Sequence, residues 1–202
     1  MQRLGAARYG HGADDGGLCL DAPENGGKSH VGRIAPEKNL PLAVRSFRAL
    51  QAQRPGARFV WVGDGPARAE LQAANPDFIF AGVQRGDALA RHFASADLFC
   101  FPSLSETFGN VTLEAMASGI ATVAFDYGAA REHLRGGVHG EAVPFGDEPG
   151  FVQALCRTGT APDLAMRGDA ARRAVLHLHP STVAAEFAAL LAGLAPRRDR
   201  AA

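Results

Sequence analysis

Short apolar runs alternate along this chain with stretches in which apolar residues return at helical spacing. The runs occupy residues 30–34, 59–62, 78–81, 97–101 and 120–125, and the helical stretches residues 39–53, 67–74, 87–95, 110–118 and 129–134, with a helix-rich end over 148–194. Uninterrupted apolar runs are typical of strands buried on both faces, as in parallel sheets covered by helices. The chain is therefore predicted to fold as an α/β domain with a doubly wound parallel sheet.

Composition excludes several classes of protein. Lys plus Arg and Asp plus Glu both number 21, so the zero net charge indicates neither a nucleic-acid nor an acidic-lipid surface. The cysteines (Cys19, Cys100 and Cys156) are odd in number and lack CxxC spacing, which argues against a disulfide framework or a zinc site. No charged and apolar leader and no apolar run of about 18 residues is evident, so a cytoplasmic protein is expected.

Changes in composition and apolar periodicity divide the chain into three parts. Residues 1–29 are rich in glycine and aperiodic, which predicts a linker or poorly ordered segment. Residues 30–180 carry the α/β pattern, and residues 181–202 read as a helix with a basic tail. Ligands of doubly wound sheets bind beyond the carboxyl ends of the strands, so the loops after the apolar runs are the candidate site.

The loop after the fourth run, SLSETFGNVTLE, predicts an anion site. Asn110 is expected to cap a helix behind a Gly109 corner, where unpaired N–H groups of Gly109, Asn110 and Val111 would face a phosphate. Glu106 precedes the corner and Glu114 lies one turn inside the helix. The two carboxylates could then flank one ligand and accept hydrogen bonds from sugar hydroxyls.

Two other interpretations of these glutamates remain open. Both could be surface acids near a helix N-terminus, where negative charge is favourable in any case. They could also form a carboxylate pair of the kind glycosidases use. The parallel-sheet context and the cations of the first loop favour the phosphate and sugar site.

The first loop, VGRIAPEKN, offers two cations after Gly32. Arg33 supplies a forked donor and Lys38 a point charge, and together they could neutralise a diphosphate. The alternative is a pair of solvent-facing bases near a helix start, a position that the helix dipole disfavours.

Two further loops offer backbone groups. Gly63 and Gly65 form a tight strand-to-helix turn, which is as well explained by structure as by ligand contact. The segment that ends in Val83 follows the third run and could contact a base edge.

Absent motifs narrow the chemistry. The chain contains no D-x-D and no HExxH, so a metal-bridged diphosphate and a zinc site find no support, and no metal or cofactor is expected. It also lacks G-x-x-x-x-G-K-[ST] and G-x-G-x-x-G, which argues against nucleoside-triphosphate hydrolysis and dinucleotide redox chemistry. Charge neutralisation falls to Arg33, Lys38 and the helix end.

These segments resemble a known family. VGRIAPEKNL, FVWVGDGPARAEL, FAGV and ADLFCFPSLSETFGNVTLEAMASGIATVAFDYGAAREHL are similar to the C-terminal, donor-binding domain of retaining GT-B glycosyltransferases of group 1 (family 4). The resemblance covers about residues 30–190 and implies a Rossmann-like GT-B domain. Among members of the family, the sequence looks most like GDP-mannose-dependent alpha-mannosyltransferases.

The resemblance implies roles for the site residues. Arg33 and Lys38 would clamp the donor diphosphate, Glu106 and the backbone at Phe108 and Gly109 would hold the donor sugar, and Glu114 the ribose. The reaction would be retaining transfer of a glycosyl group to an acceptor hydroxyl, without metal. The donor would be GDP-mannose, with a UDP-sugar as the alternative.

The chain departs from the family pattern at its start. Members carry an N-terminal acceptor-binding domain, for which the sequence before residue 31 has no room. An acceptor glycan or glycolipid, and any peripheral membrane association, would then depend on the missing half. The chain could instead be a non-catalytic nucleotide-sugar-binding module or an inactive truncated fragment; a sugar 2-epimerase-like isomerase is disfavoured because only the general architecture points to it.

Overall fold

The computed structural model describes residues 27–194, and the predictions for residues 1–26 and 195–202 lie outside this part of the chain. Within it, six strands form one parallel sheet: β1 (Gly27–Val31), β2 (Arg58–Val62), β3 (Ile79–Gly82), β4 (Leu98–Phe101), β5 (Ala121–Phe125) and β6 (Gly140–Val143). The predicted doubly wound α/β architecture is confirmed.

The strand order places a topological switch point at the centre of the sheet. The order is β3-β2-β1-β4-β5-β6, so the chain winds outward in one direction from β1 and in the other from β4. β1 pairs in parallel with both β2 and β4. In such sheets the loops after the two central strands separate and leave a crevice where ligands bind.

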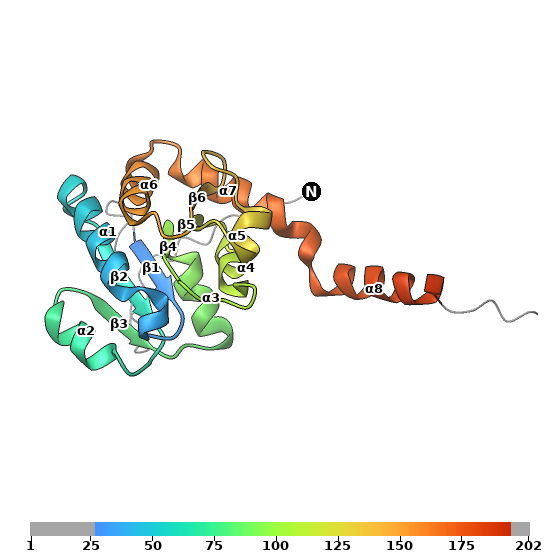
Figure 1. Cartoon of the computed structure of the whole chain (residues 1–202), viewed down its shortest axis with the longest axis horizontal. Coiled ribbons are helices and arrows are strands. Elements are labelled where there is room, and N and C mark those ends of the chain that lie inside the picture. Colours follow the sequence, from blue (N-terminus) through green and yellow to red (C-terminus); the bar gives the residue numbers. More distant parts are fainter. Residues whose placement is uncertain (1–26, 195–202) are drawn as a thin grey trace, which may run out of the picture.

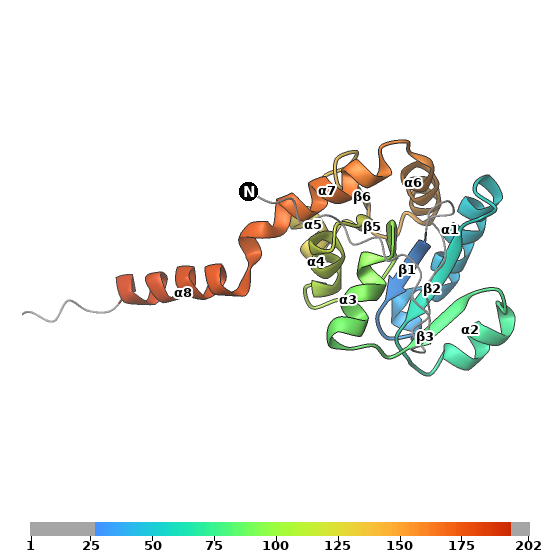
Figure 2. The same cartoon turned by 180° about the vertical axis from the view of Figure 1, so that it is seen from behind.

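Helices cover both faces of the sheet (Figures 1 and 2). They are η1 (Pro36–Lys38), α1 (Leu40–Gln53), α2 (Arg68–Ala74), α3 (Gly86–Ala94), α4 (Asn110–Ala117), α5 (Gly128–His133), α6 (Glu148–Thr160), α7 (Leu164–Val175), η2 (Leu176–Leu178) and α8 (Pro180–Leu194).

Two hydrophobic cores result from this layering. One face of the sheet packs on α1, α2 and α6 through side chains such as Phe47, Trp61 and Phe151. The other face packs on α3, α4, α5 and α7 through Phe99, Met116 and others. Alternate residues of each strand enter opposite cores, which explains why the strands read as continuous apolar runs.

The predicted boundaries of the first strand were wrong at both ends. β1 begins at Gly27, so the last three residues of the predicted linker, 27–29, belong to the strand. The strand ends at Val31 instead of residue 34. Gly32 has φ 145°, outside the extended region of L-residues, and this ends the strand before Arg33. Arg33 therefore lies in the loop and not in the sheet.

The sixth strand was not predicted. β6 has the sequence GEAV and is a short edge strand that is only partly buried. It therefore lacks the apolar run by which the other strands were predicted. By contrast, β4 lies within a predicted apolar run, and Cys100 in it is buried in the core.

The buried side chain of His30 makes stability depend on pH. His30 is fully buried beside Trp61, and desolvation lowers the pKa of its imidazole from 6.5 to about 4. Because the unfolded chain binds the proton more readily, the stability associated with neutral His30 is present above pH 6.5 and is lost as pH falls toward 4. The free energy of unfolding should fall by about 3 kcal/mol across this window.

Urea unfolding at a series of pH values tests this expectation. In the variant His30→Phe, the free energy of unfolding should depend much less on pH. A smaller dependence should remain, because burial also lowers the pKa of His92. An unchanged profile in the variant would contradict the assignment to His30.

The C-terminal helix extends away from the body of the domain. Figure 1 shows α8 projecting beyond α7, and all its residues are exposed, including Val183, Phe187 and Leu190. By length and mean hydropathy (1.2) alone, the stretch Leu164–Leu194 is apolar enough to cross a membrane, which the sequence analysis did not anticipate. Its first half, α7, buries Ala171 and Val175 against the sheet.

Candidate functional site

The loops after β1 and β4 meet at the switch point through an ion pair. Lys38, the last residue of η1, donates from Nζ to Oε1 of Glu106, which lies between β4 and α4. The two side chains are only 14% and 17% exposed, respectively. The structure thus brings together the cation and the carboxylate that were predicted from separate loops.

Further hydrogen bonds of main-chain and side-chain groups reinforce this junction. The N–H of Leu104 donates to the carbonyl of Glu37 at 2.9 Å. Ser103, buried between the loops, donates from Oγ to Oε1 of Glu106 at 2.6 Å. The hydroxyl of Tyr127 in turn donates to the carbonyl of Ser103 at 2.8 Å. Three loops are therefore tied together around one carboxylate.

The glycine corner is present, but its cap differs from the prediction. Gly109, with φ 91°, is the N-cap of α4, and Asn110 is the first helical residue, without a capping hydrogen bond from its side chain. The expected Asn110 cap was wrong because a positive φ at the cap position suits glycine. The first N–H groups of α4, at Asn110 and Val111, lie where the helix dipole favours an anion.

The residue before the corner is fixed from its other side. The carbonyl of Phe108 accepts from the N–H of Ala129 at 2.7 Å. A Cβ on Gly128 would lie 2.4 Å from that same carbonyl oxygen, so the two loops are in close backbone contact. The Phe108 ring packs edge-on against His133, with ring centroids 6.4 Å apart.

Arg33 is placed differently from Lys38. Its side chain is 66% exposed and pairs loosely with Glu37 at 3.4 Å. The structure therefore brings only one of the two predicted cations into the junction, and it leaves the other at the surface of the same loop. An exposed pair of this kind contributes little to stability.

The turn at Gly63 serves the packing of the loops. Its N–H donates to the carbonyl of Gly82 at 2.7 Å, and the N–H of Gly32 donates to the carbonyl of Val62 at 2.9 Å. A Cβ on Gly63 would lie 1.9 Å from the carbonyl oxygen of Gly32. These contacts give Gly63 a structural role, and contact of the same turn with a ligand stays a prediction.

Two predicted site residues make no described contact with the Lys38–Glu106 pair. Val83 follows β3 with 58% of its surface exposed. Glu114 is exposed on α4. Both remain predicted ligand contacts with no described partner in the junction.

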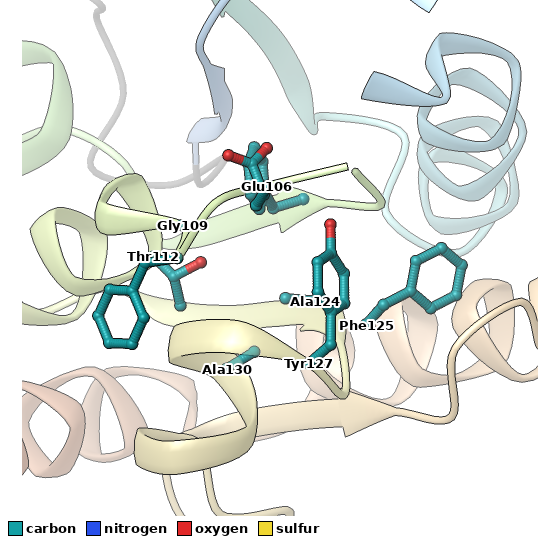
Figure 3. A pocket seen from close by; sticks show the side chains of 9 residues that line it. Glu106, Gly109, Thr112, Ala124, Phe125, Tyr127 and Ala130 are labelled. Atoms are coloured by element: carbon teal, nitrogen blue, oxygen red, sulfur yellow. The ribbon is translucent and has the colours of Figure 1, made fainter. Parts of the chain in front are cut away.

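A small pocket lies beneath the glycine corner. Figure 3 shows its lining, with Tyr127 directing its hydroxyl toward the loop that carries Glu106. Phe101, Thr112 and Ala130 contribute to its wall. Burial raises the pKa of the Tyr127 hydroxyl, and the charge on Glu106 raises it further, although the hydrogen bond to Ser103 opposes the rise. The phenol therefore stays protonated as a donor.

Sequence reasoning missed Ser103 and Tyr127. The only signal for Ser103 is its place three residues before Glu106, and Tyr127 follows β5 without any motif of its own. Within residues 27–194, no three His, Cys, Asp or Glu side chains are grouped as metal ligands.

Fold and site together define a Rossmann-like α/β domain of the GT-B kind with a part-buried ion pair at its switch point. The family model described as "Glycosyl transferases group 1" matches residues 29–160. The chain belongs to this family.

Individual relatives agree with the family. The chain is 39% identical over 148 residues to a GDP-mannose-dependent alpha-mannosyltransferase of Mycolicibacterium smegmatis, a match that covers 73% of this chain and 33% of the relative. It is 41% identical over 109 residues to the sulfoquinovosyl transferase SQD2 of Arabidopsis thaliana, covering 53% and 21%, respectively. The chain thus spans about a third or less of these relatives.

Solved structures show the same fold. Alr3699/HepE of Anabaena, determined in complex with UDP and glucose, superposes with a TM-score of 0.71 at 23% identity, covering 84% of this chain and 48% of that one. The pneumococcal O-GlcNAc transferase GtfA, in complex with UDP and GlcNAc, gives 0.72 at 18% identity, covering 83% and 35%.

Proposed function

We propose that this chain is the donor-binding half of a retaining glycosyltransferase that transfers a sugar from a nucleoside-diphosphate sugar to an acceptor hydroxyl without metal. The observation that carries the proposal is the Lys38–Glu106 pair, which sets a cation and a carboxylate side by side at the switch point. A cation there suits a diphosphate, and a carboxylate suits sugar hydroxyls.

The geometry allows Lys38 to serve both groups. An ammonium has three donors, so Lys38 can bind a phosphate oxygen while it keeps its hydrogen bond to Glu106. Arg33 would add a forked donor from the surface, and the N-terminus of α4 would add its N–H groups. Positive groups aimed at a leaving diphosphate stabilise the charge that develops there.

The remaining roles follow from position. Glu106 and the backbone at Phe108 and Gly109 would hold the donor sugar, Glu114 the ribose, and the backbone near Val83 the base. GDP-mannose is the favoured donor, supported by relatives named as GDP-mannose-dependent alpha-mannosyltransferases. A UDP-sugar is the alternative, supported by a fold neighbour solved with UDP and glucose. The acceptor would bind to a domain outside this chain.

Isothermal titration with GDP, UDP, GDP-mannose and UDP-glucose in buffer with a chelator tests the proposal. Glu114→Gln should weaken binding of the nucleoside diphosphate about tenfold, because a hydrogen bond to a charged group is lost. Glu106→Gln should weaken binding only of the sugar nucleotide. Asp169→Asn, an exposed carboxylate on α7, is the control and should change neither affinity.

The results separate the parts of the proposal. Absence of binding to all four compounds would contradict the donor site. Binding that disappears with the chelator would contradict metal independence. A reversed pattern in the two glutamate variants would exchange their roles.

A further inference from the structure

The carboxylate of Glu106 is held asymmetrically. Lys38 and Ser103 both donate to Oε1, Ser103 at 2.6 Å. In the described part of the chain, Oε2 has no hydrogen-bond partner. One oxygen is therefore anchored by the protein, and the other remains available to an outside donor.

Ser103 is itself fixed from several directions. The residue is 1% exposed, its carbonyl accepts from the Tyr127 hydroxyl, and the next N–H, at Leu104, donates to the carbonyl of Glu37. The hydroxyl has a single proton, and its 2.6 Å contact with Glu106 is far shorter than its 3.5 Å and 3.4 Å contacts with the carbonyls of Glu37 and Ser105. The hydroxyl therefore donates its hydrogen bond to the carboxylate of Glu106 and not to either carbonyl.

The two donors differ in what a diphosphate would do to them. Lys38 is charged, and its ammonium would be shared between Glu106 and a bound diphosphate. Ser103 is neutral and buried beneath the loop, so a phosphate would leave its hydrogen bond in place. Of the two hydrogen bonds to Oε1, the one from Ser103 would therefore be the same with and without a bound diphosphate.

We propose that Ser103 is a positioning residue that anchors Oε1 of Glu106 so that Oε2 faces a hydroxyl of the donor sugar, with Tyr127 holding Ser103 in place. This inference rests on the proposed function. The alternative is that the hydrogen bond of Ser103 has a structural role only, in which it gives a buried hydroxyl a partner and stabilises the loop.

Titration of the full chain with GDP, GDP-mannose, UDP and UDP-glucose distinguishes the two roles. Ser103→Ala should raise the ratio of the sugar nucleotide's Kd to the nucleoside diphosphate's Kd roughly tenfold, because only the sugar depends on the orientation of Glu106. Ser105→Ala, an exposed neighbour whose carbonyl is retained, should leave the ratio unchanged.

A second variant keeps the test valid if Ser103→Ala unfolds. Tyr127→Phe removes only the hydroxyl that holds the Ser103 carbonyl and should raise the same ratio about threefold. Thermal unfolding of each variant establishes that the folded chain is compared.

Two results would overturn the inference. A ratio that stays at its wild-type value in both variants, or an equal loss of affinity for both compounds, would show that Ser103 has only a structural role. Absence of nucleotide binding by the wild-type chain is a distinct result, which would contradict the proposed function and this inference with it.

Discussion

Lys38→Ala is expected to weaken the binding of GDP or UDP by about 10- to 100-fold, or roughly 1.5–3 kcal/mol. The side chain is only 14% exposed, so its charge acts across a partly desolvated crevice. The loss should be the same in the presence of a chelator, because the cation and not a metal neutralises the diphosphate. Isothermal titration measures it directly.

Two further variants serve as comparisons for Lys38→Ala. Arg33→Ala should have a smaller effect, because the guanidinium is 66% exposed and hydrated before the ligand arrives. Arg157→Ala, on the exposed side of α6, should have none. Unchanged affinity in both the Lys38 and Arg33 variants would remove the diphosphate clamp from the mechanism.

Gly63→Ala is expected to destabilise the domain by about 3–5 kcal/mol. The residue has φ 138°, and the new methyl carbon would lie 1.9 Å from the carbonyl oxygen and 2.9 Å from the carbonyl carbon of Gly32. A backbone carbonyl cannot rotate away as a flexible side chain does, so the loops after β1 and β2 would have to separate. Urea unfolding monitored by circular dichroism measures the change.

Gly137→Ala is the matched control for this substitution. Gly137 also has a positive φ of 73°, but no atom lies within 4 Å of its added carbon, so only the backbone strain of about 1–2 kcal/mol should appear. Equal losses in the two variants would show that the contact with Gly32 is unimportant.

The fold class was predictable because strands that are buried on both faces of a sheet have continuous apolar sequences. β4 is apolar throughout, β2 is apolar and buried after Arg58, and β5 is buried along its whole length with Thr122 as its one polar residue. The limits of all three strands lie close to the predicted runs. β6 has no such sequence, since an edge strand needs no continuous apolar run. The true end of β1 was obscured because Val31 and Ile34 are both apolar and both buried, although only Val31 is in the strand.

The site was predictable where a residue's chemistry is rare in its context. Lys38 and Glu106 stood out as charges beside glycine corners, and the structure pairs them. Ser103 and Tyr127 did not, because serine and tyrosine are common in loops, and their contacts join β4 to the segment after β5. Such contacts depend on the strand order, which periodicity alone does not reveal.

The ion pair at the switch point joins residues 68 positions apart in the sequence. They meet only because β1 and β4 lie side by side, so the crevice cannot exist in a partly folded chain in which this pairing has not formed. A ligand that binds only the native chain adds to the free energy of unfolding, by about 2.7 kcal/mol at a hundred times its Kd. The supply of sugar nucleotide would then help to keep the centre of the sheet assembled.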